Sequence, residues 1–123
     1  MTMLYKNFIV AKICQDTSRS IECPYGGRIT IKSADISRTD RDVCSAGKAW
    51  FVWCPSQSVL EQVDGLCKDK TKCQLNYFNN PDISEKNIRL MNDKCQRIDN
   101  KVLEVVYECS IGKNLYQNNI LYH

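Results

Sequence analysis

Two stretches of the chain alternate between polar and apolar residues in a way that predicts β-strands. Arg28 to Lys32 places Ile29 and Ile31 on one face of a half-buried strand. Residues 101–109 are rich in β-branched residues and predict the strongest strand of the sequence. The apolar face of this strand carries Leu103, Val105, Tyr107 and Cys109, and the other face carries Glu104 and Glu108.

Aromatic residues between positions 50 and 53 predict a third strand. An equally good interpretation is that Trp53 and Cys54 simply fill the core. Trp50, Phe51 and Trp53 also suit an exposed recognition patch, but buried aromatic rings are commoner in a small core.

The spacing of Ser58 and Glu61 predicts the start of a short helix. In a capping box, the serine hydroxyl and the glutamate each satisfy a free backbone donor. Val63 and Leu66 continue the apolar face at helical spacing. Gly65 weakens the last turn, so we expect the helix to end near Cys67.

Residues 76–92 predict an exposed excursion. Asn79 to Asp82 is a turn signal, and Ser84 to Met91 is a weak helical stretch. We therefore expect that trimming residues 79–91 spares folding. Because strand patterns outnumber helical ones, the sequence predicts a single mainly β (α+β) domain.

Eight cysteines form an even set, which predicts a disulfide framework and an oxidising, extracellular location. Metal sites usually need close cysteine pairs, but the tightest spacing is Cys67 to Cys73 and the one histidine is His123. We expect no metal and no cofactor. The polar segment between Cys67 and Cys73 is expected to form a small loop closed by a local disulfide.

The net charge of +3 arises from interspersed charges and is too mild to predict nucleic-acid binding. Lys68 to Lys72 is either a solvated loop or a contact for an acidic glycan. The apolar run Phe8 to Ala11 is too short for a signal-peptide core, and no stretch predicts membrane insertion. If the cysteines are paired, either a secretion signal has been removed or the chain is a domain cut from a longer secreted or membrane-anchored protein, and we favour the second.

The sequence does not predict an enzyme. Acid-base catalysis most often uses histidine, and His123 stands alone at the end of the chain. A secreted disulfide-rich toxin or inhibitor is a further class that cysteine-dense scaffolds serve. A recognition module is the better interpretation.

The cysteine spacings and their flanking residues resemble those of a known family. This family is the galactose- and rhamnose-binding lectin domains of the sea-urchin egg lectin (SUEL) type, which also occur in latrophilin receptors. Four segments carry the resemblance: Cys23-Pro24 before the strand at residues 29–34, Arg38-Thr39-Asp40 before Cys44, the Cys54-x12-Cys67-x5-Cys73 block, and Val102 to Val105 ending in Tyr107-Glu108-Cys109. The expected division is an N-terminal extension (1–13), a SUEL-type lectin-like domain (14–109) and a C-terminal tail (110–123).

The resemblance implies a disulfide-rich β-sandwich with one short α-helix. It also implies a disulfide pairing, whereas spacing alone leaves 105 possibilities for eight cysteines. The implied pairs are Cys14-Cys44, Cys23-Cys109, Cys54-Cys95 and Cys67-Cys73.

The sugar site of the family is where this chain departs from the pattern. Gln15 replaces a glutamate, and Ile36 offers neither the stacking ring nor the hydroxyl of a tyrosine. Asp93 keeps its place, but the proline that normally follows it is lost, and residues 96–101 do not match the family loop. The candidate ligand-binding residues are Gln15, Asp35, Ile36, Arg38, Asp93 and Lys101.

Two functions remain open from the sequence. One is a carbohydrate-binding module with altered specificity and weak or absent rhamnose binding. The other is a protein-recognition domain of a cell-surface receptor or adhesion protein that has lost monosaccharide binding. Structural roles compete at each site: Arg38 often anchors its own loop, and Asp35 and Asp93 often accept backbone hydrogen bonds in turns.

Overall fold

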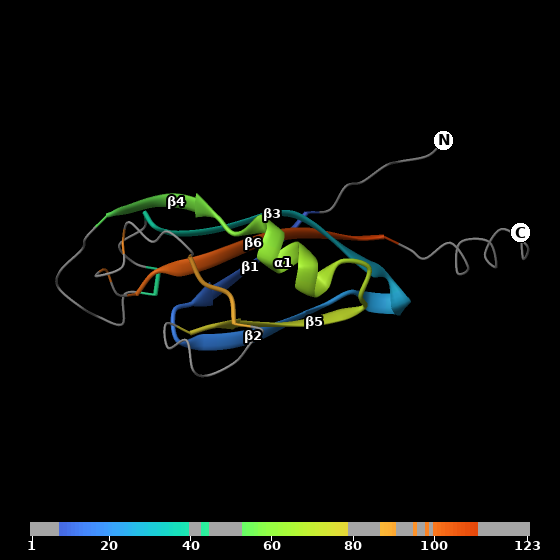
Figure 1. Cartoon of the computed structure of the whole chain (residues 1–123). Coiled ribbons are helices and arrows are strands. Elements are labelled where there is room, and N and C mark those ends of the chain that lie inside the picture. Colours follow the sequence, from blue (N-terminus) through green and yellow to red (C-terminus); the bar gives the residue numbers. More distant parts are fainter. Residues whose placement is uncertain are drawn as a thin grey trace, which may run out of the picture.

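Two antiparallel β-sheets pack face to face in a computed structural model that describes residues 8–39, 43–44, 53–78, 87–90, 95, 98 and 100–110 (Figure 1). The four-stranded sheet has the order β1 (Ile9–Cys14), β6 (Val102–Ser110), β3 (Arg28–Arg38) and β4 (Cys54–Ser58). The two-stranded sheet pairs β2 (Thr17–Glu22) with β5 (Lys72–Tyr77). One short α-helix, α1 (Leu60–Cys67), contacts β3 and β5. The mainly β fold with one α-helix is confirmed.

The two central strands, β3 and β6, confirm the predicted alternation and extend it. Ile29 and Ile31 are buried in β3, but the strand continues to Arg38. A shift of register between Ile31 and Ser33 inserts one extra residue into the pairing with β6. This irregularity moves the inward positions from odd to even numbers, so Ile36 is buried in turn.

The first strand of the sheet lies within the segment predicted as an N-terminal extension. β1 begins at Ile9 and pairs with β6 along its whole length, from Ile9 opposite Tyr107 to Cys14 opposite Val102. Ala11 and Ile13 are buried in the core. Residues 9–13 are therefore part of the sheet, while the division of the rest of the chain into a domain and flanking segments stays a prediction.

The two-stranded sheet is an addition to the predicted elements. On β5, Cys73, Leu75 and Tyr77 are buried and alternate with more exposed polar residues. On β2, Ile21 is the one buried residue. The residues of β2 are too polar to predict a strand. Backbone pairing with β5, rather than burial of its own side chains, holds β2 in the sheet.

The helix begins one residue later than the capping box requires. Val59 occupies the N-cap position and makes no side-chain cap. The Ser58 hydroxyl instead accepts a hydrogen bond from the Leu60 backbone N–H at 3.2 Å. The predicted capping box is therefore wrong in register, but the predicted end of the helix at Cys67 is confirmed. The buried face consists of Val63 and Cys67.

The aromatic segment before β4 lies mostly outside the described residues. Residues 50–52 cannot be compared with the predicted strand. Trp53 is described and is 60% exposed, so its interpretation as a core residue is wrong. Cys54 is fully buried and begins β4.

Four disulfides link the elements, and the implied pairing is confirmed. The bonds join Cys14 to Cys44, Cys23 to Cys109, Cys54 to Cys95 and Cys67 to Cys73. Cys23 follows β2 and Cys109 lies in β6, so this bond ties the two sheets together. All eight cysteines are paired.

Part of the predicted exposed excursion packs into the core. Ile88 is fully buried, and its backbone N–H donates to the Asn76 carbonyl at 2.9 Å. The Asn87 side chain accepts from the Phe78 N–H at 2.7 Å and donates to the Phe78 carbonyl. Residues 87–90 are not helical, and the rest of the segment at 79–86 and 91–92 lies outside the described residues. The prediction that this segment is an exposed excursion is therefore wrong at Ile88, while the expectation that trimming residues 79–91 spares folding stays a prediction.

Within the described ranges, no helix is both long and apolar enough to cross a membrane.

Candidate functional site

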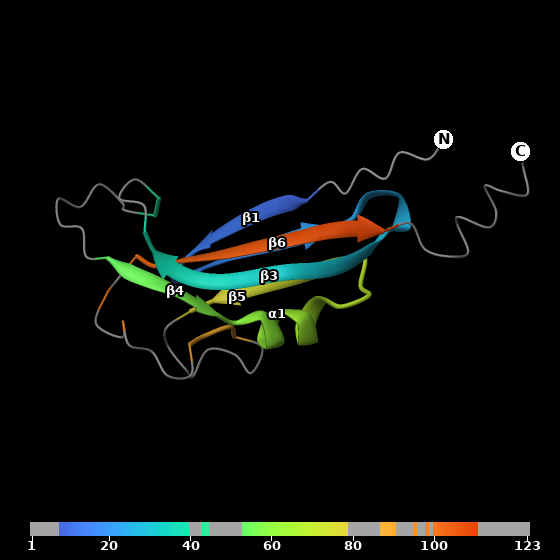
Figure 2. The same ribbon diagram turned by 90° about the horizontal axis from the view of Figure 1, so that it is seen from above.

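The candidate residues that the structure brings together lie at one end of the four-stranded sheet. β3 ends there and β6 begins there, with Ser37 opposite Val102. β1 ends at the same level, because Cys14 is also opposite Val102. β4 begins beside them, with Cys54 opposite Arg38. Figure 2 shows these strand ends side by side, and we call this region the sheet end.

Gln15 and Lys101 are joined through their backbones and one side chain. The Gln15 N–H donates to the Lys101 carbonyl at 2.9 Å, and the Lys101 N–H donates to Gln15 Oε1 at 3.1 Å. Gln15 is 9% exposed and Lys101 is 1% exposed. The Lys101 ammonium donates to the Cys95 carbonyl at 3.0 Å. Both side chains therefore hold the protein's own backbone at this position.

Arg38 is the third member of the group. It is 3% exposed, and its Nη1 donates to the carbonyl of Asn100 at 3.3 Å. Asn100 directly precedes Lys101, so Arg38 and Gln15 contact adjacent residues at the start of β6. This geometry gives Arg38 the loop-anchoring contact that arginine often makes, because its planar donors suit carbonyl groups.

The remaining candidates do not join this group. Ile36 is fully buried in the hydrophobic core between the sheets. Asp35 is half-buried and lies opposite Glu104 on one side and Ser58 on the other. Neighbouring strand residues point to opposite faces, so Asp35 lies on the outer face of the sheet. Asp93 lies outside the described residues.

An exposed aromatic residue stands beside the group. Trp53 immediately precedes Cys54, whose backbone pairs with Arg38, so the chain at Trp53 lies at the sheet end. Aromatic residues in a small domain are usually buried, which is why the sequence favoured the core for Trp53. Trp53 could have been found from its place before a cysteine of the family framework, but only its exposure shows that the ring faces solvent.

The chemistry of the sheet end suits noncovalent recognition. Among the described residues, no group of three or more His, Cys, Asp or Glu side chains could hold a metal ion. The side chains gathered there are the buried amide of Gln15, guanidinium of Arg38 and ammonium of Lys101, and the exposed indole ring of Trp53. These groups donate and accept hydrogen bonds and offer an apolar surface.

Comparison with known proteins assigns the family. Residues 21–109 match the family model of the D-galactoside/L-rhamnose binding SUEL lectin domain, which is more than half of the chain. The chain therefore belongs to the SUEL lectin domain family, as the disulfide framework indicated. This family is one of carbohydrate-binding modules rather than enzymes. No protein in the curated collection matches the chain significantly.

Proposed function

We propose that this chain is an extracellular carbohydrate-recognition domain whose specificity differs from that of galactose- and rhamnose-binding members. Its membership of the SUEL family supports carbohydrate binding. Its four disulfides support an oxidising compartment, either as a secreted protein or as the ectodomain of a membrane protein. The proposed site is the sheet end.

One observation carries the altered specificity. The Oε1 atom of Gln15, which stands in place of the family's glutamate, accepts the Lys101 N–H at 3.1 Å. An amide lacks the second anionic oxygen with which a carboxylate binds sugar hydroxyls. Losing such a charge-assisted contact costs about 1.5 to 3 kcal/mol, or roughly one to two decades of affinity. We therefore expect weak or absent binding of monosaccharides at this position.

Trp53 supplies a different kind of contact. The family position that offers an aromatic hydroxyl is Ile36 here, and this side chain is sealed in the core. The exposed indole of Trp53 is an apolar face at the same end of the sheet, and such a face suits stacking on a sugar ring. We propose that it replaces the missing tyrosine as the apolar wall of the site.

Protein recognition is the second candidate function, and the burial of the polar residues favours it. Gln15, Arg38 and Lys101 are all less than 10% exposed and bonded to the protein backbone. A tryptophan beside side chains that are held firmly in place also suits the centre of a protein interface. The cell-surface partner would then replace the glycan at the sheet end.

An NMR titration separates these proposals. The oxidised, isotope-labelled domain is titrated with L-rhamnose, D-galactose and a panel of neutral oligosaccharides. We expect an oligosaccharide to shift the amide signals of Gln15, Trp53 and Lys101, with no micromolar binding of rhamnose. No shift from any saccharide would favour protein recognition, and micromolar rhamnose binding would contradict the altered specificity.

A matched pair of variants tests the role of Trp53. Tyr25 is also exposed, at 89%, but it lies in the short 3-10 helix η1 (Pro24–Gly26), just before the opposite end of β3. Trp53→Ala is expected to weaken the oligosaccharide about fivefold or more, the equivalent of about 1 kcal/mol of aromatic contact. Tyr25→Ala is expected to leave affinity unchanged. Equal effects of the two substitutions would rule out stacking on Trp53.

A further inference from the structure

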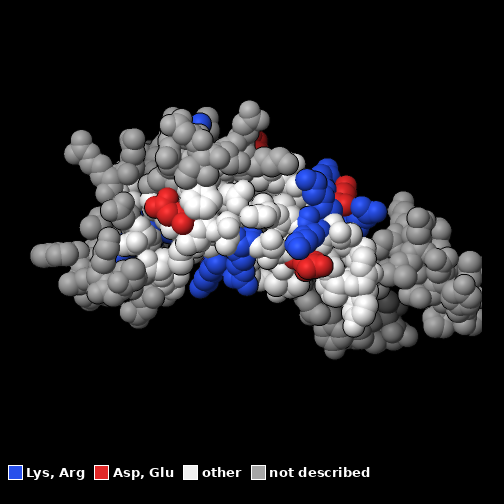
Figure 3. Space-filling model, turned by 90° about the horizontal axis from the view of Figure 1, so that it is seen from below, with Lys and Arg blue, Asp and Glu red and all other residues white. Residues whose placement is uncertain are grey.

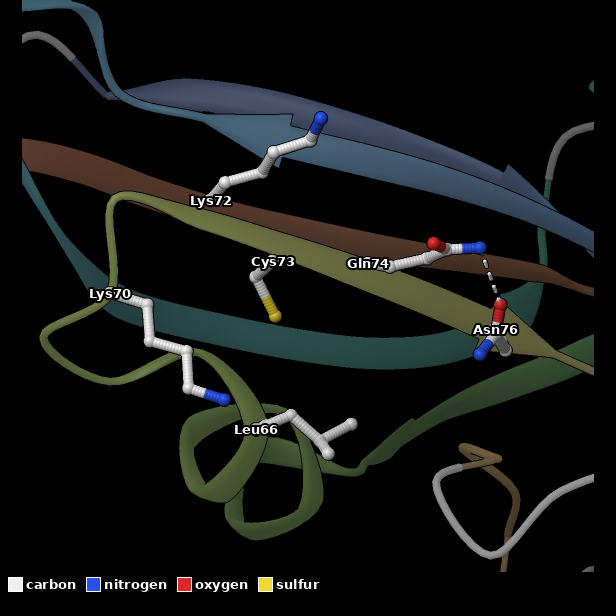
Figure 4. A pocket seen from close by; sticks show the side chains of 6 residues that line it. All are labelled: Leu66, Lys70, Lys72, Cys73, Gln74 and Asn76. Atoms are coloured by element: carbon white, nitrogen blue, oxygen red, sulfur yellow. Dashed lines mark hydrogen bonds between the residues drawn. The ribbon is translucent and has the colours of Figure 1, made fainter.

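A cavity lies between α1 and β5, separate from the residues of the sheet end. Its volume is about 290 Å³, close to the lower limit of roughly 300 Å³ for small-molecule sites. The residues that line it are Leu66, Lys70, Lys72, Cys73, Gln74 and Asn76. In Figure 4 the Lys70 side chain points toward Leu66 and the helix, whereas the Lys72 side chain points away from them.

The alternation of β5 gives the cavity its polar wall. Cys73, Leu75 and Tyr77 point into the core, so Lys72, Gln74 and Asn76 point to the other face of the strand. Gln74 Nε2 donates to Asn76 Oδ1 at 3.3 Å, which holds the two amides side by side. This bond uses one donor of Gln74, and both amides keep further donors and acceptors. Paired amides of this kind suit the hydroxyl groups of a sugar.

The backbone holds Lys70 in place. The Ile29 N–H donates to the Lys70 carbonyl at 2.8 Å, and the Lys70 N–H donates to the Cys67 carbonyl at 3.1 Å. The Cys67-Cys73 disulfide closes the same loop. The charged segment from Lys68 to Lys72 is thus anchored to β3 rather than only solvated. A fixed loop loses less conformational entropy when it binds a ligand.

The charge of the cavity is positive. Of the described residues that line it, none is acidic. The ion pairs found in the described part of the chain are Lys12-Glu104 and Lys32-Glu108, and neither uses a lysine of the cavity. The acidic residues beside these lysines are Glu22, which pairs directly with Lys72 across the sheet, and Asp69, which precedes Lys70 in the chain. Figure 3 shows Lys and Arg side chains on the β2 and β5 side of the molecule, with acidic side chains among them.

We propose that this cavity binds an acidic saccharide. Sulfate or carboxylate groups of the sugar contact Lys70 on the helix side and Lys72 on the strand side of the cavity, and its hydroxyls contact Gln74 and Asn76. Leu66 provides the apolar surface against the ring. The inference goes beyond the proposed function, because it uses no residue of the sheet end and would stand if that site bound nothing.

A pair of charge-matched double variants tests the proposal. The probe is a heparin-derived tetrasaccharide, compared by calorimetry with its desulfated form, which keeps the carboxylates, and with a neutral tetrasaccharide. Lys70→Ala/Lys72→Ala is expected to weaken the acidic saccharide at least about tenfold, because charge-assisted contacts are lost. The control, Lys12→Ala/Lys32→Ala, removes the same charge from ion pairs elsewhere and is expected to change affinity less than about twofold.

The outcomes separate the possible ligands. Loss of binding on desulfation assigns the anion as sulfate, and retained binding assigns it as carboxylate. Equal binding of the neutral tetrasaccharide, or equal effects of the two double variants, would overturn the proposal. Tighter binding of a sulfotyrosine peptide that depends on Lys70 and Lys72 would also overturn it, in favour of an acidic peptide.

Two single substitutions refine the test. Glu22→Gln removes the negative charge opposite Lys72 and is expected to strengthen the acidic saccharide about twofold or more. Gln74→Leu removes the amide but keeps the charge, and it is expected to weaken the saccharide about fivefold. If Gln74→Leu has no effect, the cavity attracts charge without recognising a sugar, which would contradict the proposal.

Discussion

The side chain of Gln15 acts as a structural acceptor for the backbone of Lys101. The hydrogen bond from the Lys101 N–H to Gln15 Oε1 is 3.1 Å long and is buried at the start of β6. A buried backbone N–H without a partner costs about 1 to 3 kcal/mol. The residue at this position therefore stabilises the sheet end.

This role leads to a prediction for Gln15→Leu. The substitution leaves the Lys101 N–H without its side-chain acceptor and is expected to lower the free energy of unfolding by about 1 to 3 kcal/mol. Urea unfolding of the oxidised protein measures the change. Gln74→Leu is the matched control on an exposed position, with an expected change within about 0.5 kcal/mol. Equal destabilisation by both substitutions would show that the Gln15 bond contributes nothing.

At the residue scale, the sequence identified positions better than roles. The resemblance named Gln15, Arg38 and Lys101, and the structure brings them together. Their burial could not be predicted, because it depends on strand ends that meet from distant parts of the chain. For Trp53 the error is the reverse: the sequence favoured a buried ring, but the side chain is exposed.

The strands β1 and β2 show what patterning alone misses. The alternation of β3 and β6 is visible because each places apolar residues on one face for several positions. β2 has five exposed residues among six, so its sequence resembles a loop. β1 has exposed apolar residues at its start, which hides the alternation that buries Ala11 and Ile13. Pairing with a stronger neighbour determines both strands.

The contribution of β1 can be measured with two substitutions on the strand. Ile13 is 1% exposed, so Ile13→Ala removes buried apolar surface and is expected to cost about 2 to 5 kcal/mol of unfolding free energy. Val10→Ala is the control, because Val10 is 49% exposed, and we expect a change within about 0.5 kcal/mol. A small effect of Ile13→Ala in urea unfolding would show that β1 contributes little to the stability of the domain.

Residues 87–90 lead to a prediction about deletions. Phe78 and Asn87 are hydrogen-bonded to one another, so a short linker can join them when residues 79–86 are removed. This deletion is expected to preserve folding. Removing 79–91 also deletes the fully buried Ile88 and is expected to prevent folding or to cost several kcal/mol. Secretion yield and thermal unfolding report the difference, and equal stability of the two deletions would contradict the packing of Ile88.

On the scale of the whole molecule, the disulfides link both distant and neighbouring parts of the chain. The Cys23-Cys109 bond spans a sequence separation of 86 residues and connects the two sheets. The Cys67-Cys73 bond spans a separation of 6 residues and closes a local loop. Spacing alone singled out the local pair. The other three pairs came from the family resemblance, because long-range pairing depends on the fold.

The disulfides are therefore expected to differ in their contribution to stability. In the loop-entropy description, the Cys23-Cys109 bond contributes about 4 to 5 kcal/mol and the Cys67-Cys73 bond about 2 kcal/mol. Replacing each pair with two alanines and measuring urea unfolding tests this order. If the Cys67-Cys73 variant is the less stable of the two, the link between the sheets is not the main covalent constraint.

The central claim is that this SUEL domain still recognises a glycan, but not the usual monosaccharides of its family. A glycan array probed with the oxidised, folded domain tests it most directly, with rhamnose, galactose, neutral oligosaccharides and sulfated glycans present. The account predicts binding to at least one oligosaccharide or sulfated glycan, without strong signals for rhamnose or galactose. Strong rhamnose binding would contradict the altered specificity. A blank array from protein with all four disulfides intact would contradict carbohydrate recognition itself and favour a protein partner.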